Sequence, residues 1–473
     1  MSKTNNNFFK ALNKYELETI APAIARASIH TFYRLFNRDE ESDQKYKHAA
    51  TFEIVDEGKI YDTVLYTWEF HIFTYFAVLN CSIKGAWRIT DQELSLLVNK
   101  YRSYYNNLNV YDKEKGICKF LSCTTYEQFK CQAPNLVIEQ FNRVYHILIA
   151  SKKVDRNNIK PIAEIMNEVL GITVEEYLKC LILICEICLC SPYILTAPQE
   201  LFAERFDEAT VKNVKKIVEY YTIDVLSVKN SEQKERCFYS KPFLRYYNKK
   251  DTILTSSPLI FQKLGDGLFW IIREYYSSKK EKQIQTKFVN TFGLLFEQYF
   301  FEVCNCYLPD SCFKIPEGQY KTPDFMLKVG RHTILAELKS SLLPISAKTQ
   351  FPDLAAIEDF LKRTVEKASK QLAAFTDNIN TVKFIVLFED LPNISLVEHI
   401  DANSSARIAT ISDMERLLSL AGTDIAGAGK ILDRVLKDDN RPSLQQILNE
   451  EHIPNKWASE LSYFNDLTEA VEV

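Results

Sequence analysis

Two short apolar segments, residues 323–329 and 333–339, carry charged side chains where a buried strand seldom has them. A Gly-Arg turn separates the segments, and the second one alternates as a strand does, so we expect a β-hairpin. Glu337 and Lys339 are two residues apart on the second strand, and their side chains therefore leave the same face of the sheet. We expect Asp324, at the start of the first strand, to lie beside them once the hairpin forms.

Two carboxylates and a lysine are the groups that a metal-dependent phosphodiester hydrolase uses. Mg²⁺ is a hard cation that takes oxygen ligands and keeps several waters, so one or two carboxylates together with phosphate oxygens suffice to bind it. The metal activates water, and a lysine beside it can position or deprotonate that water. The alternative interpretation is a solvated hairpin with a surface Glu and Lys. The apolar residues on both sides of Glu337 favour a buried strand instead, where isolated charges are costly.

The order of these residues resembles the PD-(D/E)xK nuclease superfamily, which has the restriction-endonuclease-like fold. Pro323-Asp324 and Glu337-Leu338-Lys339 stand where that pattern has its two halves. Residues 293–297 (GLLFE) are similar to the GxxxE motif of RecB-like exonucleases, on the helix before the core strands. Residues 371–375 (QLAAF) are similar to the QxxxY motif on the helix after those strands, with Phe375 where Tyr is usual. The resemblance covers roughly residues 285–415.

The resemblance implies a role for each matched side chain. Asp324 and Glu337 would bind Mg²⁺ or Mn²⁺, and Glu297 would add a ligand directly or through water. Lys339 would assist the attacking water, and Gln371 would orient Lys339 or the scissile phosphate. The products would carry 5′-phosphate and 3′-hydroxyl ends.

These features predict a metal-dependent deoxyribonuclease, with RNA as an open alternative to DNA. A nuclease joined to an unfamiliar helical domain is typical of prokaryotic antiphage defence or restriction, which is an analogy at the level of the fold. Two other functions stay open. One is a non-catalytic nucleic-acid-binding module that keeps the fold. The other is a helical sensor or assembly protein whose nuclease half is inactive until a defence-system partner or a phage component binds. Association of the chain into a homo-oligomer also stays open.

Composition is that of an ordinary globular protein. The chain has 473 residues, enough for two or three domains, with 46% hydrophobic and 25% charged residues. Its net charge of −4 offers no global attraction for nucleic acid, so DNA binding would need a local basic patch. The first residues lack an apolar signal core, and the longest apolar run, residues 180–190, is too short to span a bilayer. We therefore expect a cytoplasmic protein without membrane contact.

Cysteine usage agrees with that expectation. Twelve cysteines in a chain without an export signal favour reduced thiols. Four of them, Cys180, Cys185, Cys188 and Cys190, share a helical segment but no single tight face, so we interpret them as core residues and not as metal ligands. No cysteine follows Cys312, which argues against the iron–sulfur cluster of some RecB-like nucleases.

The first half of the chain is predicted to be helical, because apolar residues recur with the helical period and strand-like alternation is scarce before residue 250. Two capping boxes, Thr90 with Glu93 and Thr173 with Glu176, mark helix starts. The expected helices are residues 16–36, 61–79, 91–108, 126–150, 159–170, 174–189 and 210–221. This part is therefore predicted to be a large all-α N-terminal domain.

Residues 229–287 carry a concentration of positive charge. Thirteen Lys or Arg residues stand against six Asp or Glu, interleaved with Phe and Tyr. Basic and aromatic side chains together suit phosphate contact and base stacking, and Lys279, Lys280 and Lys282 lead directly into the Glu297 helix. A solvated linker and helix surface is the equally weighted alternative.

The remaining segments complete an α/β core. A helix over residues 286–305 precedes the hairpin, a helix over 353–376 follows it, and 383–388 and 407–411 are expected strands. A helix capped by Ser412 and Glu415 comes next, and then an acidic helical tail that packs on the core or mediates association. The predicted domains are residues 1–228 (helical), 229–285 (basic connecting segment), 286–421 (nuclease) and 422–473 (C-terminal extension).

Overall fold

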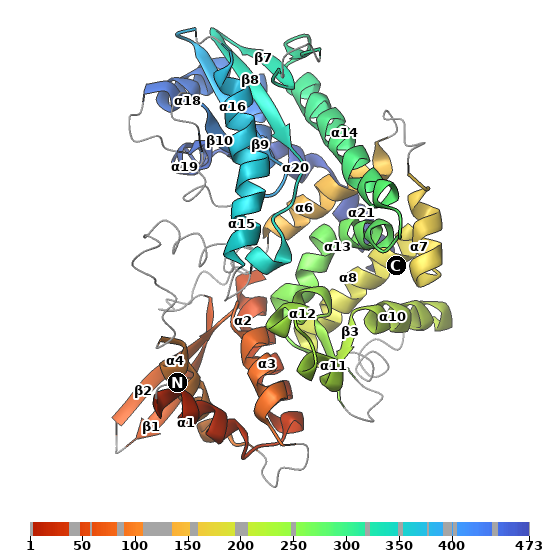
Figure 1. Ribbon diagram of the computed structural model, residues 1–473, viewed down its shortest axis with the longest axis vertical. Coiled ribbons are helices and arrows are strands. Elements are labelled where there is room, and N and C mark those ends of the chain that lie inside the picture. Colours follow the sequence, from red (N-terminus) through yellow and green to blue (C-terminus); the bar gives the residue numbers. More distant parts are fainter. Residues whose placement is uncertain are drawn as a thin grey trace.

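The chain is a mixed α/β protein in which helices predominate. The structure is a computed structural model and describes residues 3–36, 48–56, 59–82, 89–106, 135–151, 159–193, 207–246, 252–316, 322–348, 353–375, 378–390, 400, 404–437 and 443–472. The mostly helical first half fills the lower and middle parts of Figure 1, and the largest sheet lies at the top. Within the described ranges, no helix combines the length and the apolar character that a membrane span requires.

The largest sheet has five strands in the order β10-β9-β8-β7-β6. β6 (Cys312–Lys314), β7 (Phe325–Val329) and β8 (His332–Lys339) are antiparallel neighbours. β9 (Thr381–Leu387) runs parallel to β8, and β10 (Arg407–Thr410) runs parallel to β9. The four strands predicted from sequence are thus present, with β6 as an additional edge strand.

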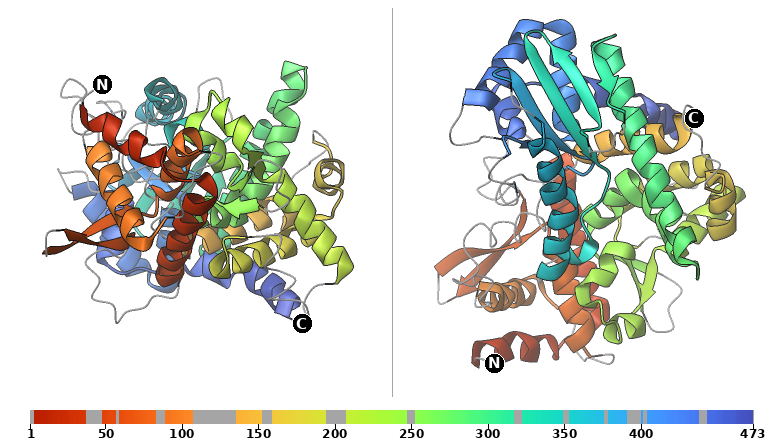
Figure 2. Two further views of the ribbon diagram at one scale, coloured as in Figure 1. Left: turned by 90° about the horizontal axis from the view of Figure 1, so that it is seen from below. Right: turned by 45° about the horizontal axis from the view of Figure 1, so that its top comes forward.

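Helices cover both faces of this sheet, as the right-hand view of Figure 2 shows. Ile334, Ala336 and Leu338 of β8 belong to the core that also contains residues of α14 and α17. Leu335, which points the other way, packs with residues of α15 and α16. Burial on both faces explains why β8 and β9 are almost continuously apolar. The helices are α14 (Lys282–Tyr307), α15 (Leu354–Leu361), α16 (Lys367–Ala373) and α17 (Ile411–Thr423), with a π-helical turn, η5 (Lys362–Glu366), between α15 and α16.

The predicted helices of the first half are present, apart from one that is partly wrong. They are α2 (Leu17–Phe36), α3 (Phe70–Asn80), α4 (Asp91–Asn106), α6 (Asn135–Tyr145) with η2 (His146–Ala150), α7 (Ile162–Leu170), α8 (Val174–Cys190) and α10 (Glu208–Tyr220). An additional helix, α1 (Lys3–Leu12), was not predicted. The predicted residues 107–108 and 126–134 lie outside the described part of the chain. Both predicted capping boxes form, at Thr90 with Glu93 and at Thr173 with Glu176.

The prediction of an all-α N-terminal domain is wrong. β1 (Ala49–Asp56) and β2 (Lys59–Tyr66) form an antiparallel hairpin, so the helix predicted to begin at residue 61 begins only at Phe70. A second small sheet joins β3 (Thr222–Asp224), β4 (Phe243–Arg245) and β5 (Thr252–Leu254). The aromatic-rich run before residue 70 satisfies helical and strand periods about equally over a short window, and the pairing with β1 decides the outcome.

The stretch expected to connect the two halves is itself part of the packed interior. α13 (Ser257–Ser277) is buried over most of its length and contacts α6, α8 and α14. α11 (Val225–Lys229), a 3₁₀ turn η3 (Lys234–Arg236) and α12 (Cys237–Ser240) precede it. The aromatic residues that we considered for base stacking are buried: Phe238, Tyr239, Phe243 and Tyr246, whereas Tyr247 lies outside the described residues. Burial rules out stacking by these four rings.

The C-terminal region is helical and packs on the core, as one of the two sequence alternatives proposed. Its helices are α18 (Ile425–Lys437), α19 (Leu444–Glu450), α20 (Lys456–Glu460) and α21 (Tyr463–Glu472). α17 contacts α18, α19 and α20, and α21 contacts α6 and α8. The cap of α17 differs from the prediction: Thr410 and Asp413 form the capping box, because Ser412 and Glu415 are already inside the helix and buried. Glu415 is used elsewhere, as described below.

Candidate functional site

Asp324 lies immediately before β7, and its position follows from the register of the hairpin. Phe325 pairs with Ala336, so Asp324 stands next to the end of β8. Its Oδ2 accepts a hydrogen bond of 2.6 Å from the backbone N–H of Leu338. Its own carbonyl oxygen accepts one of 2.9 Å from the backbone N–H of Ile315, just beyond β6. The carboxylate of Asp324 is therefore held by β8, and its backbone is held next to β6.

Glu337 and Lys339 leave β8 together, as the two-residue spacing predicted. The Lys339 ammonium donates to Glu337 Oε1 at 2.5 Å. Glu337 is only 2% exposed. Its burial fits the central position of β8, which has a neighbouring strand on each side. Its second oxygen, Oε2, is buried without a hydrogen-bond partner. A buried carboxylate oxygen that is left unsatisfied is costly, and such an atom indicates a ligand or a functional role.

Burial raises the pKa of both carboxyl groups. Burial, and then the neighbouring Glu337 carboxylate, raise the pKa of Asp324 to about 7, while the Leu338 N–H opposes the shift. Burial also raises the pKa of Glu337, against the lowering effect of the Lys339 ammonium. Close carboxylates with raised pKa values are typical of functional sites, because a cation or a proton is needed to hold them together.

Gln371 on α16 reaches the same cluster. Its side chain lies close enough to the Glu337 carboxylate to lower the pKa of that group. The carbonyl Oε1 of Gln371 is buried without a hydrogen-bond partner, like Oε2 of Glu337. The helix after the strands therefore contributes a polar group to the site, as the sequence predicted.

Glu297 on α14 lies at the margin of the site. Its charge contributes to the raised pKa of Asp324, which places it near that carboxylate. Its Oε2 accepts an ion-paired hydrogen bond of 2.7 Å from Lys314 on β6. The Lys314 side chain is 59% exposed, whereas that of Glu297 is 24% exposed. Lys314 was missed by the sequence analysis because its position depends on the edge strand β6, which no pattern indicated.

The residues present fit a divalent cation bound by two carboxylates. The described part of the chain contains no group of three or more His, Cys, Asp or Glu side chains arranged to hold a metal ion. Mg²⁺ does not require such a cage, since it binds through one or two carboxylates, waters and substrate phosphates. The unpartnered oxygen of Glu337 and the raised pKa of Asp324 are the features that favour a cation here. Lys314 engages only Oε2 of Glu297, so Oε1 is the atom with which Glu297 would act as a third donor.

The predicted nucleic-acid contacts lie at the junction of α13 and α14. Lys280 and Lys282 are exposed, and Lys279 is partly buried with its ammonium 3.9 Å from the ring centre of Tyr275. Glu281 is the residue that precedes α14. The described residues show no ion pair between Glu281 and these lysines, so the surface run keeps its positive charge.

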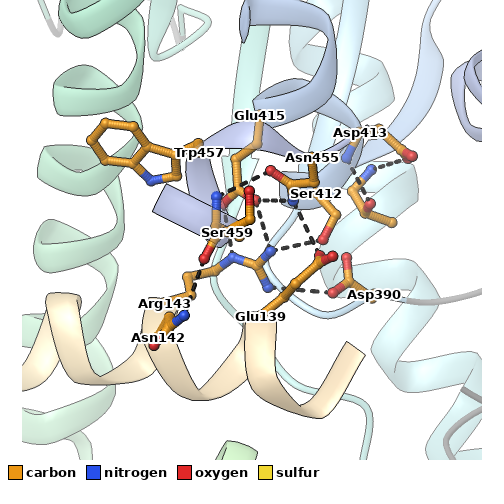
Figure 3. A network of polar contacts seen from close by, with 12 residues as sticks. Glu139, Asn142, Arg143, Asp390, Ser412, Asp413, Glu415, Asn455, Trp457 and Ser459 are labelled. Atoms are coloured by element: carbon orange, nitrogen blue, oxygen red, sulfur yellow. Dashed lines mark hydrogen bonds and ion pairs between the residues drawn. The ribbon is translucent and has the colours of Figure 1, made fainter. Parts of the chain in front are cut away.

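A second polar cluster, which the sequence analysis missed, joins the helical half to the sheet (Figure 3). Arg143 of α6 is 1% exposed and donates from Nε and Nη2 to the two carboxylate oxygens of Glu415, each at 2.8 Å. It also donates to Ser412 at 2.7 Å and to Asp390 at 3.3 Å. Tyr299 of α14 donates to Glu415 at 2.7 Å.

The C-terminal helices complete this cluster. The Asn455 amide donates to Glu415 and to Glu139, and the Trp457 indole donates to Tyr299 at 2.8 Å. Burial, which outweighs the attraction of Arg143, raises the pKa of Glu139 to about 7. The partners come from α6, α14, α17 and the segment at α20, so no local sequence pattern could have revealed them. The dense set of internal partners points to a structural role.

Comparisons with known proteins add no relative. No protein-family model matches the chain, and neither a curated protein nor a solved structure does.

Proposed function

We propose that this protein is a metal-dependent nuclease that hydrolyses phosphodiester bonds of DNA at Asp324, Glu337 and Lys339. The observation that supports it best is the buried Glu337 Oε2, which has no partner and belongs to the same cluster as Asp324, whose pKa is raised to about 7. A buried Glu–Lys pair with a purely structural role is more stable when both carboxylate oxygens accept hydrogen bonds. An open acceptor on a buried strand is the arrangement expected of a site that receives a cation.

The arrangement of the core is compatible with the restriction-endonuclease-like fold. A helix with Glu297, the β6–β7–β8 strands, a helix with Gln371 and the parallel strands β9 and β10 follow one another in the chain. That order supports the proposal that residues 286–421 are a nuclease domain of the PD-(D/E)xK type. A setting in antiphage defence or restriction is a further part of the proposal and rests on analogy of domain arrangement alone.

Each side chain has a defined part in the proposed reaction. When bound, Mg²⁺ or Mn²⁺ would supply Lewis-acid chemistry and an acidified water. Asp324 and Glu337 would hold the cation, and a proton would leave Asp324 as they do, because its pKa is about 7. Lys339 has two ammonium hydrogens besides the one given to Glu337, and these would orient the attacking water or the scissile phosphate. Gln371 would keep Glu337 and Lys339 in place.

The direct test is a plasmid-nicking assay with Mg²⁺. Asp324→Ala and Glu337→Ala should each abolish cleavage and weaken Mn²⁺ binding measured by calorimetry, while thermal unfolding shows an intact fold. Asp62→Ala, an exposed carboxylate on β2, is the matched control and should cleave as the parent does. Undiminished nicking by either site variant would refute the assignment.

Lys339→Ala separates catalysis from binding. It should lose cleavage but keep Mn²⁺ and DNA binding, because the proposed role of Lys339 lies in the hydrolytic step. Loss of DNA binding with normal cleavage per bound complex would instead make Lys339 a phosphate anchor. A parent that binds DNA and metal but never cleaves would favour the non-catalytic or partner-activated alternatives.

A further inference from the structure

Helices cover both faces of the large sheet, but one face stays open at the β6 edge. On the side where α15 and α16 pack, Leu335 of β8 is 7% exposed and Met326 of β7 is partly buried. Phe313 of β6, which pairs with Met326, is 44% exposed. Its neighbour Cys312 belongs to the core on the other face, so the Phe313 ring lies on the side of Met326. An aromatic ring is therefore accessible at the edge of this face.

The same face carries the candidate metal site. Alternate residues of a strand share a face, so Met326 and Lys328 of β7 leave the sheet together. Asp324 stands two residues before Met326, at the end of the same row. From Asp324 to Lys328 the row is about 13 Å long, because each strand residue adds about 3.3 Å. Phe313 lies beside the middle of the row, since it pairs with Met326.

The charges along this row suit a nucleic-acid strand. Lys328 is exposed, takes part in no ion pair with another described residue, and has the uncharged Thr333 as its cross-strand neighbour on β8. At the other end, burial raises the pKa of Glu337, and the Lys367 ammonium of α16 is among the charges that oppose this shift. Lys367 is exposed and lies four residues before Gln371, on the same face of the helix. A lysine therefore stands near each end of the row.

We propose that this face is a subsite for a single-stranded segment of DNA, in which Phe313 stacks on an unpaired base and Lys328 binds a phosphate of the same strand. An isolated exposed ring is ordinary on a protein surface. A ring between a lysine and a candidate metal site is, however, the combination that holds unpaired strands by stacking and by charge. The bases of a duplex are already stacked on one another, which closes their faces to a side chain.

The subsite selects which DNA the protein acts on, and this part of the inference rests on the proposed nuclease function. About two nucleotides of an extended strand span the distance from Asp324 to Lys328. A strand whose scissile phosphate lies at the carboxylates therefore reaches Phe313 with an adjacent base. Because that base stacks only when it is unpaired, the substrate is single-stranded DNA or an unpaired end of a duplex.

The test measures binding of two labelled DNA probes to the full chain in EDTA, which prevents metal-dependent cleavage. The probes are an oligodeoxythymidine of about 12 nucleotides and a blunt duplex of the same length. Phe313→Leu keeps an apolar side chain but has no ring. It should weaken binding of the single strand by about fivefold to 100-fold, the value of one stacked base, and leave binding of the duplex as in the parent. Phe313→Tyr keeps the ring and should bind the single strand as the parent does.

Two further variants and their controls complete the test. Leu226→Ala removes apolar surface at a position of α11 that is 57% exposed, and should bind both probes as the parent does. Lys328→Ala should lower the slope of log affinity against log salt for the single strand by about 0.7, whereas Phe313→Leu should leave the slope unchanged. Lys100→Ala, an exposed lysine on α4, is the control for Lys328→Ala. Thermal unfolding checks that each variant is folded.

Three results would overturn the stacking subsite: no binding of the single strand by the parent, equal binding by Phe313→Leu and the parent, or an equal loss on the single strand and the duplex. A loss in Phe313→Tyr as large as that in Phe313→Leu would do the same, and an unchanged slope in Lys328→Ala would overturn the phosphate contact. Plasmid nicking in Mg²⁺ tests the proposed function separately. A parent that nicks DNA while Phe313→Leu binds normally refutes the subsite alone. A parent that binds single strands through Phe313 but never nicks DNA supports the subsite and refutes the nuclease.

Discussion

At the scale of single residues, the buried carboxyl group of Asp324 lowers the stability of the metal-free protein when it is ionised. Burial raises its pKa to about 7, above the ordinary value for an aspartate. Between roughly pH 4 and pH 7 the folded protein therefore holds a proton that the unfolded chain releases. Stability without metal must fall as the pH rises through this interval and then level off. The sequence indicated which carboxylates meet, but the rise of the Asp324 pKa depends mainly on burial, which only the fold defines.

Replacing Asp324 by Asn should consequently stabilise the metal-free protein. We expect a gain of about 1–3 kcal/mol at pH 8, shrinking towards pH 4, because the neutral amide carries no desolvated charge. Urea unfolding of parent and variant in EDTA at several pH values measures the difference. Asp62→Asn, at an exposed position on β2, is the control and should follow the parent. Parallel stability profiles for Asp324→Asn and the parent would show that the carboxylate is not destabilising.

The ion pair of Lys314 with Glu297 could not be predicted from the sequence. Glu297 was found from its motif, but its pairing with Lys314 requires β6 at the edge of the sheet. Three residues of β6 carry no alternation long enough to be recognised. The contacts of Arg143 could not be predicted either, because its partners are far away in the sequence.

At the scale of elements, the strands that carry the site were the most predictable part of the chain. β8 and β9 are mostly buried on both faces, whereas β7 alternates between buried and more exposed residues. Gly330 takes the positive φ of 57° that the hairpin turn requires. The β1–β2 hairpin was missed because its apolar and polar residues fit both periods. Its pairing partner, not its own sequence, selects the strand.

The junction of α13 and α14 gives an element-scale prediction for DNA binding. If Lys279, Lys280 and Lys282 contact phosphates, replacing all three by Ala should weaken binding to any DNA sequence. Each lost contact should also remove about one unit from the slope of log affinity against log salt. The cleavage rate at saturating DNA should change little.

Binding isotherms over a range of salt concentrations, for the parent and this triple variant, provide the measurement. A second triple variant with the same charge change, Lys100, Lys212 and Lys215 to Ala, uses exposed lysines on α4 and α10 as the control. Identical slopes for the parent and the junction variant would leave the junction as ordinary surface charge.

At the scale of the whole molecule, the buried Arg143 cluster decides whether the helical half and the sheet behave as one body. Arg143 of α6 holds Glu415 of α17, and residues of α14 and of the segment at α20 hold the same carboxylate. A helical region attached to the five-stranded α/β core could have been a separate domain on a linker. The continuous core that includes residues of α8, α13, α14 and β8 argues for a single packed unit instead.

Arg143→Met should therefore destabilise the entire chain. Removing the guanidinium leaves Glu415 buried and without its cation, and breaking such a pair costs about 3–5 kcal/mol. Adding Glu415→Gln should restore part of the loss, because the uncompensated charge is then gone. Arg434, which pairs with Glu450 and Glu451 at the surface, is the control: Arg434→Met should cost no more than about 1 kcal/mol. Urea unfolding, followed separately by far-UV circular dichroism and by tryptophan fluorescence, measures the loss of stability and shows whether the two halves unfold together. If Arg143→Met were as mild as Arg434→Met, or if only one of the two signals shifted, the cluster would not join the two halves into one cooperative unit.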